Sequence, residues 1–180
     1  MSDSEVQTAI RVYTGARKYS AATADRWCGL DAGDGGALLQ LATDLQLGEN
    51  QLRDVWDWAE EIAERDGVAL HHVLATAPIM AVRARKLGRN DKLKAIKAAL
   101  RRLRFPQLAD VEDRLADIVR SMELPRTVRV ALPEHLEGDQ VRIEIIATSE
   151  AAWRSAAAAL LTAAESPACM QLFALLGEAP

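Results

Sequence analysis

Aromatic residues and cysteines are scarce in this sequence of 180 residues. Aromatic residues make up 4% of the chain, although 49% of it is hydrophobic. A core must therefore be built mainly from Ala, Leu, Val and Ile, a composition that favours closely packed helices because alanine is the strongest helix former. The two cysteines, Cys28 and Cys169, have no spacing typical of a metal site or a disulfide framework. We expect them to be free thiols in the reducing cytoplasm, with a disulfide as the alternative.

The sequence also lacks the segments that direct proteins into or across membranes. No stretch approaches the roughly 20 apolar residues that span a bilayer. The first residues, Met1–Glu5, are polar and acidic, whereas a signal peptide starts basic and continues apolar. We therefore expect a cytoplasmic protein without a membrane partner.

Catalytic and metal-binding patterns are missing as well. His71 and His72 are adjacent, so a helix would point them about 100° apart, and His135 stands alone in a predicted loop. The sequence contains no glycine-rich phosphate loop, Gly-x-Ser-x-Gly elbow or cysteine pair. The glycine-rich stretch 31–36 resembles a calcium loop superficially but lacks the downstream glutamate of such loops. We expect no catalytic residue, metal or cofactor, and an enzyme of unrecognised type is the second alternative.

Charge is unevenly distributed along the chain. The net charge is −4, yet residues 83–104 contain ten Lys and Arg and one acid, which gives +9, while the other residues hold 12 bases and 25 acids, which gives −13. The ten bases are Arg83, Arg85, Lys86, Arg89, Lys92, Lys94, Lys97, Arg101, Arg102 and Arg104. So dense a basic segment predicts an anionic partner, either nucleic acid or an acidic protein surface such as residues 54–64 of the same or a neighbouring chain. A charged face that is merely solvated is the simpler alternative.

Hydrophobic periodicity predicts a mainly α protein with a small α+β unit at its C-terminal end. Apolar residues recur at helical spacing in segments 4–30, 37–46, 51–65, 68–76, 78–87, 90–104 and 107–122, with a loop predicted for 31–36. Alternation predicts two strands, 127–132 and 141–146, before helices 150–165 and 167–177. We expect a helical bundle followed by a two-stranded antiparallel hairpin packed on two helices, with domains at 1–123 and 124–180.

The sequence also predicts how three of these helices begin and pack. Asn90 is a plausible N-cap of the basic helix. The apolar seams of helices 90–104 and 107–122 are expected to pack against each other because the link between them is short. The helix 150–165 is expected to turn Trp153, Leu161 and several alanines inward.

Residues 41–55 resemble the helix-turn-helix of bacterial DNA-binding proteins. Ala42 occupies the position where the two helices touch, residues 46–48 form the turn, and Leu52 and Val55 anchor the second helix. Two features depart from the pattern: the turn position usually held by glycine is Gln46, and the second helix carries five acids between 54 and 64. The alternative is therefore a packing unit of three helices with an acidic outer face.

The first residues of that second helix are the ones expected to contact DNA bases. Asn50, Gln51 and Arg53 precede the acidic stretch and could reach base edges in a groove. The acids that follow oppose binding, because DNA affinity comes mainly from neutralised phosphates. The basic segment 83–104 is therefore the stronger candidate for a phosphate contact.

The helix-turn-helix-like segment, the basic helix and the C-terminal hairpin together loosely resemble chromosome- and plasmid-partition proteins of the ParB type. The resemblance implies a middle domain that binds DNA and C-terminal strands that pair between subunits. The arginine-rich N-terminal nucleotide-binding box of that family is not evident in this sequence. Independently of the resemblance, an exposed strand edge invites pairing.

These observations lead to one expectation and to a first alternative, besides the enzyme of unrecognised type named above. We expect a non-enzymatic, nucleic-acid-associated or regulatory protein that acts as a homodimer. The alternative is a protein-interaction adaptor whose basic helix docks on an acidic partner.

Overall fold

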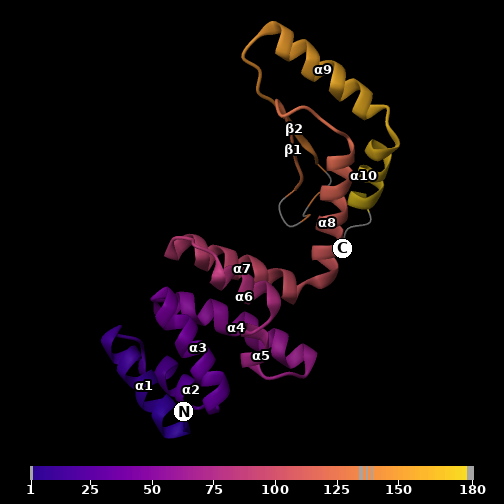
Figure 1. Ribbon diagram of the computed structural model, residues 1–180. Coiled ribbons are helices and arrows are strands. Elements are labelled where there is room, and N and C mark those ends of the chain that lie inside the picture. Colours follow the sequence, from indigo (N-terminus) through magenta and orange to yellow (C-terminus); the bar gives the residue numbers. More distant parts are fainter. Residues whose placement is uncertain (1, 134–135, 137, 139, 178–180) are drawn as a thin grey trace. The chain divides into compact units, whose positions relative to one another are not determined.

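The computed structural model describes residues 2–133, 136, 138 and 140–177, so that His135 lies outside the described residues. Within these residues the chain forms ten helices and one two-stranded antiparallel sheet (Figure 1). The chain divides into two compact units, the N-terminal unit (Met1–Arg104) and the C-terminal unit (Phe105–Pro180). The predicted fold class, a helical bundle followed by a hairpin and two helices, is confirmed.

The N-terminal unit contains seven of the described helices. They are α1 (Asp3–Ala16), α2 (Ala21–Cys28), α3 (Ala32–Leu45), α4 (Glu49–Asp66), α5 (Leu70–Leu74), α6 (Ala77–Ala84) and α7 (Arg89–Arg104). Helix α4 packs against α5 and α7, and α3 packs against α1, α5 and α7. The predicted amphipathic pattern of α4 is confirmed, because its six apolar positions are all buried: Leu52, Val55, Trp56, Ala59, Ile62 and Ala63.

Two tryptophans fill the centre of this unit. Trp27 and Trp56 are both 0% exposed, and their ring centroids lie 6.4 Å apart. The Trp27 indole N–H donates a hydrogen bond to the Gly35 carbonyl oxygen at 3.2 Å, and the Tyr13 ring meets Trp27 edge to face. A small number of large rings therefore ties α1, α2, α3 and α4 together in a core that is otherwise aliphatic.

The loop predicted for residues 31–36 is wrong, because this stretch begins α3. Asp31 is the N-cap, and its carboxylate accepts a hydrogen bond from the Asp34 backbone N–H at 2.9 Å. A Cβ atom at Gly35 would lie 3.3 Å from Val6 and 3.4 Å from Ile10, and one at Gly33 would lie 3.1 Å from the His71 ring. These glycines therefore permit close packing of α3 on α1 and α5 and do not mark a loop.

The basic helix also begins differently from the prediction. Asn90 is not its N-cap, because α7 starts at Arg89 and the Lys92 backbone N–H already donates to the Gly88 carbonyl oxygen at 2.9 Å. The seam of α7 is buried in the N-terminal unit, where Leu93 is 9% exposed and Ile96 and Leu100 are 0% exposed. This seam is completed by α3, α4 and α6.

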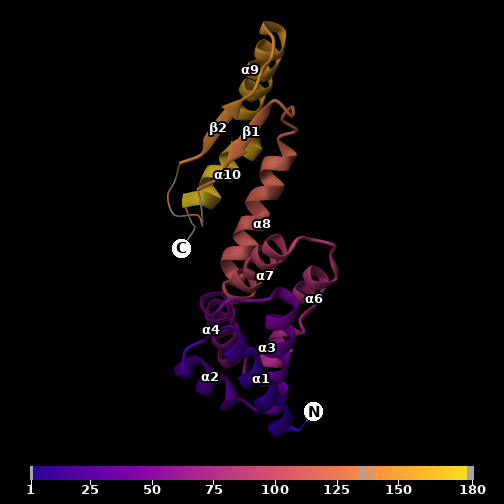
Figure 2. The same ribbon diagram turned by 90° about the vertical axis from the view of Figure 1, so that its left-hand side faces the viewer.

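The C-terminal unit is built from α8 (Pro106–Ser121), β1 (Val128–Ala131), β2 (Arg142–Ile145), α9 (Glu150–Ala164) and α10 (Pro167–Gly177). The strands pair antiparallel, with Val128 opposite Ile145 and Ala131 opposite Arg142. Figure 2 shows the two strands side by side. Among the described residues of this unit one small cluster of buried leucines forms a core: Leu115, Leu136, Leu172, Leu175 and Leu176.

The boundary between the units lies at Arg104/Phe105 and not at the predicted 123/124. The reason is that α8 packs against α10, and the leucines of α10 bury Leu115 completely. The seams of α7 and α8 were expected to cover each other. The seam of α7 is instead buried in the N-terminal unit, and the seam of α8 packs against the leucine cluster of the C-terminal unit.

The inward face predicted for α9 is wrong at its largest residues. Trp153 is 58% and Leu161 64% exposed, and the buried residues of α9 are Ala156 and Ala163. Met170 and Phe173 of α10 are exposed as well, at 70% and 53%. In the described residues no single helix is long and apolar enough to cross a membrane, whereas α9 and α10 meet that test only as a pair bent by 68°.

Trp27 and Trp153 form a matched pair for testing this difference in burial. We expect Trp27→Ala to lower the free energy of unfolding by about 3–5 kcal/mol, because it removes a ring from a packed core. Trp153→Ala should change it by less than about 1 kcal/mol, because an exposed side chain leaves no cavity. Urea titration followed by circular dichroism measures both values. Equal losses for the two variants would contradict the assigned positions of the two rings.

Candidate nucleic-acid interface

The turn between α3 and α4 is held in one conformation by two tyrosines. Gln46 ends α3 in the left-handed region, with φ 47° and ψ 48°, which is the conformation that glycine adopts most easily. Leu47 is fully buried, and its carbonyl oxygen accepts hydrogen bonds from the Tyr13 hydroxyl at 3.1 Å and the Tyr19 hydroxyl at 2.8 Å. Burial raises the pKa of both tyrosines, so their hydroxyls stay neutral donors.

The three residues expected to contact bases differ in their surroundings in the first turn of α4. The Gln51 side-chain oxygen accepts a hydrogen bond from the Gly48 backbone N–H at 3.1 Å, so Gln51 closes the N-terminal cap of α4. Asn50 and Arg53 are exposed. The side-chain oxygen of Gln51 therefore has a structural partner, which leaves Asn50 and Arg53 as the more accessible of the three.

Glu49, at the start of α4, also has a structural role. Its carboxylate accepts hydrogen bonds from the Ser20 and Thr23 hydroxyls and the Ser20 backbone N–H. The two hydroxyl hydrogen bonds are the largest cause that lowers the pKa of Glu49. The carboxylate of Glu49, at the N-terminal end of α4, is thereby held against the first turn of α2.

Arginines from two other elements lie on the turn itself. The Arg17 guanidinium donates to the Gln46 carbonyl oxygen at 2.8 Å, and the Arg89 guanidinium donates to the Gln46 side-chain oxygen at 3.3 Å. With Arg53 they bring three positive charges to the start of α4. Reading the sequence missed Arg17, because no local pattern connects the end of α1 with residue 46.

The acids of α4 are paired with bases of the same chain. Lys97 and Arg104 of α7 bind Asp54 at 2.6 Å and Glu61 at 2.5 Å. On the other side of α4, Arg26 of α2 binds Asp57 at 2.8 Å and Glu60 at 2.5 Å. The acidic outer face, which argued against DNA binding, is thus largely neutralised within the chain.

The same contacts divide the ten bases of segment 83–104 into groups. Arg83 binds Asp44 at 2.8 Å, and the Lys92 ammonium donates to the Arg83 carbonyl oxygen at 3.0 Å. A first group is thus engaged within the N-terminal unit: Arg83, Arg89, Lys92, Lys97 and Arg104. Arg102 is exposed and Arg101 is half-buried. Arg85, Lys86 and Lys94 are exposed, and their side chains make no hydrogen bond or ion pair with another described residue.

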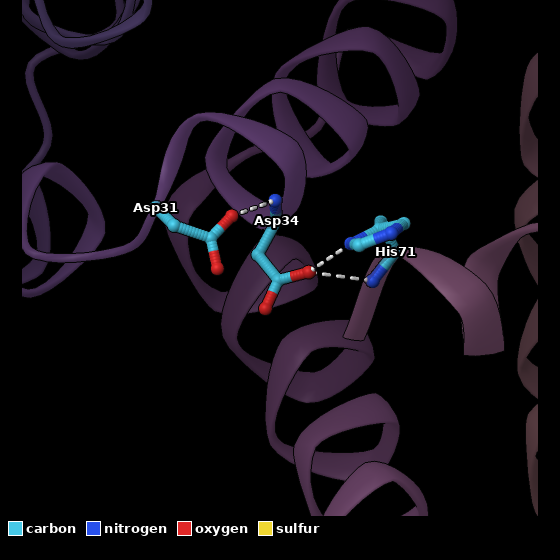
Figure 3. A group of neighbouring side chains, drawn as sticks. All are labelled: Asp31, Asp34 and His71. Atoms are coloured by element: carbon cyan, nitrogen blue, oxygen red, sulfur yellow. Dashed lines mark hydrogen bonds and ion pairs between the residues drawn. The ribbon is translucent and has the colours of Figure 1, made fainter. Parts of the chain in front are cut away.

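Asp31, Asp34 and His71 form a cluster that sequence reading did not identify. Figure 3 shows Asp34 between the Asp31 side chain and His71, whose backbone N–H and ring Nδ1 both meet the Asp34 carboxylate, at 2.8 and 2.6 Å. One ligand atom of each of the three residues lies within 4.8 Å of the others, so the set could hold a metal ion. Each atom already has a structural partner, because Asp31 caps α3 and Asp34 caps α5 from the neighbouring helix.

An open pocket of about 310 Å³ lies beside this cluster. Its lining includes the carboxylates of Asp34, Glu60 and Glu64 with the aliphatic side chains of Leu30 and Val68. No histidine, cysteine, serine or lysine is among the lining residues in the described chain, so the pocket offers no nucleophile with a neighbouring base.

Comparison with protein-family models, with curated proteins and with solved structures finds no match to this chain.

The pKa of Asp34 gives a prediction for the stability of this region. Burial raises that pKa, but the hydrogen bonds donated by the His71 backbone, the His71 ring and the Leu70 backbone outweigh it and hold the pKa below its ordinary value of 3.8. A depressed carboxyl pKa stabilises the fold above the unfolded-state pKa, and this contribution is lost as the pH falls through the folded-state value.

We therefore expect Asp34→Asn to lower the free energy of unfolding by about 1–2 kcal/mol at neutral pH. The variant should also lose less stability than the parent as the pH falls from about 4 through the depressed folded-state pKa of Asp34, because only the parent loses the contribution of a carboxylate there. Urea titrations between acidic and neutral pH measure both effects. Asp31→Asn is the control, since asparagine caps a helix as well as aspartate does, and it should cost little. Parallel pH profiles for Asp34→Asn and the parent would contradict this account.

Proposed function

We propose that this chain is a non-enzymatic, nucleic-acid-associated protein of the cytoplasm that acts as a dimer. The observation that carries the proposal is the exposure of polar and basic side chains at the start of α4 and in the segment that runs from the end of α6 into α7, where Arg89 contacts the α3–α4 turn. These side chains are Asn50, Arg53, Arg85, Lys86 and Lys94, and together we name them the α4–α7 basic surface. Arg17 and Arg89 add positive charge at the adjoining turn.

Three features support phosphate binding at this surface. The start of a helix carries a partial positive charge and exposed N–H groups. The side chains of Arg85, Lys86 and Lys94 have no acidic partner among the described residues. The acids of α4 that would repel a phosphate are held by Arg26, Lys97 and Arg104.

The α3–α4 turn supports duplex DNA as the target. Gln46 is left-handed at the turn position that glycine usually holds in a helix-turn-helix, and a buried Leu47 and a new helix at Glu49 follow it, which supports the proposal. A helix that enters the major groove reads bases with the residues of its first turns, and here these are Asn50 and Arg53.

The phosphate contact predicts a change in salt dependence. Arg85→Ala/Lys86→Ala/Lys94→Ala should weaken duplex binding and reduce the slope of log affinity against log salt by about 0.9 for each phosphate contact removed. Fluorescence anisotropy with a labelled duplex, titrated at several low salt concentrations, measures the slope.

The matched control is Arg120→Ala/Arg126→Ala/Arg154→Ala, which removes the same charge from exposed positions of the C-terminal unit. It should bind like the parent. If the parent retards neither duplex nor single-stranded nucleic acid at low salt, the proposal fails. Capture of a protein partner that survives nuclease treatment and depends on Lys94 would then favour the adaptor alternative.

Base reading by α4 is tested separately. Selection of bound duplexes from a random pool should enrich a defined sequence with the parent protein. Asn50→Ala/Arg53→Ala should lose that enrichment, because each good base contact contributes about 1–3 kcal/mol of discrimination. Binding to unselected duplex should fall much less, since the phosphate contacts stay. Identical enrichment by parent and variant would assign base reading to other residues.

A further inference from the structure

Strand β2 has one edge that pairs with no strand in the described residues. The sheet contains β1 and β2 alone, and the side chains of Arg142, Ile143 and Glu144 are all exposed, with Ile143 at 52%. An isolated two-stranded sheet is marginally stable in water. Edge strands are also protected in most proteins, because their free N–H and C=O groups accept a further strand.

The ladder fixes which backbone groups of β2 point to that free edge. The Ile146 backbone N–H donates to the Thr127 carbonyl oxygen at 2.7 Å, one pair beyond Val128 and Ile145. Backbone groups alternate in direction along an antiparallel strand. The N–H and C=O of Arg142 and Glu144 therefore point to β1, and those of Ile143 and Ile145 point outward.

We infer that a second copy of this chain pairs with β2 through this edge, antiparallel and centred on Ile143. In this register Ile143 faces Ile143 of the other copy and exchanges both backbone hydrogen bonds with it, as its outward direction requires. Arg142 then lies directly opposite Glu144 of the other copy, and the twofold symmetry repeats this pair. The strand is complementary to itself in charge.

The charges also exclude the neighbouring registers. A shift by two residues, which keeps the direction of the backbone groups, places either Arg142 opposite Arg142 or Glu144 opposite Glu144. Like charges directly opposite each other destabilise a strand pair. Strand β1 offers no equivalent, because residues 127–132 contain Arg129 and no acid.

Pairing at this register also continues the side-chain pattern of the existing sheet. Arg129 lies opposite Glu144 within the chain, so Glu144 would stand between Arg129 and Arg142 of the other copy. On the other face, Val130 lies opposite Ile143, so the two isoleucines would join two valines in one apolar row. The exposed Ile143 is thereby buried at the centre of a four-stranded sheet.

This inference rests on the dimeric part of the proposed function and is independent of nucleic acid. Two variants test this interface. In Arg142→Glu, positions 142 and 144 of β2 are both acidic, and in Glu144→Arg they are both basic. Each alone places like charges opposite each other twice and should raise the dimer dissociation constant at least about tenfold. An equimolar mixture should restore dimers, because every acid then faces a base. Sedimentation equilibrium without nucleic acid measures all three samples.

The mixture separates an interface effect from unfolding, because two unfolded variants would not assemble. The Glu144→Arg variant could unfold because its new charge repels Arg129, which lies opposite it in the same chain. In that case the double variant Arg129→Glu/Glu144→Arg is used in its place, because it keeps opposite charges at these two positions. Arg120→Glu, an exposed charge reversal on α8, should dimerise like the parent.

Two results would overturn the inference. A parent protein that is monomeric at all concentrations would remove both this interface and the dimeric part of the proposed function. Dimers that persist in both single variants would place the interface elsewhere and leave dimerisation itself intact. Neither result bears on the salt dependence of nucleic-acid binding, so each failure can be recognised separately.

Discussion

Burial of one face of α4 is the constraint on which the N-terminal unit depends. A buried Leu, Val, Ile or aromatic side chain contributes about 1.5–3 kcal/mol, whereas an exposed ion pair contributes about 0–1 kcal/mol. The apolar face of α4, with Trp56 at its centre, therefore sets the rotation of the helix, and the charged face follows. Because the helix repeats every 3.6 residues, this rotation also fixes where Asn50 and Arg53 emerge.

The ion pairs around α4 have their main effect on charge distribution and contribute little to stability. Arg26, Lys97 and Arg104 are each between 30% and 40% exposed at their side chains, so solvent screens their attraction to the acids. They nevertheless cancel the negative charge along the middle of α4. Positive charge is left at Arg53, at the turn and along the outer side of α6–α7. A chain with net charge −4 can thereby present a basic surface.

The sequence predicted the elements whose signals are local. Ser149 caps α9 directly before an alanine-rich run, and Pro106 and Pro167 each occupy the first turn of a helix. Residues 31–36 were mispredicted because several glycines in a short stretch usually indicate a loop. In this chain Gly35 instead allows α3 to pack closely against Val6 and Ile10.

The candidate site was less predictable, because its contacts join residues far apart in the chain. Lys97 and Asp54 are 43 positions apart, and His71 and Asp34 are 37 apart. The density of bases in 83–104 was visible in the sequence. Which of them bind α4 and which stay exposed depends on the packing of α7 on α4, which no local pattern encodes.

The two units differ in how completely they bury their own apolar surface. The N-terminal unit encloses two tryptophans at 0% exposure, whereas the C-terminal unit encloses five leucines and leaves Trp153, Leu161, Met170 and Phe173 exposed. A small core cannot support many exposed apolar groups unless another surface covers some of them.

Assembly through the C-terminal unit would also affect how strongly the N-terminal unit binds a nucleic acid. A single α4–α7 basic surface has few bases with which to hold a nucleic acid. Two such surfaces joined in one dimer would make the second contact intramolecular, and avidity would then exceed the affinity of either surface alone.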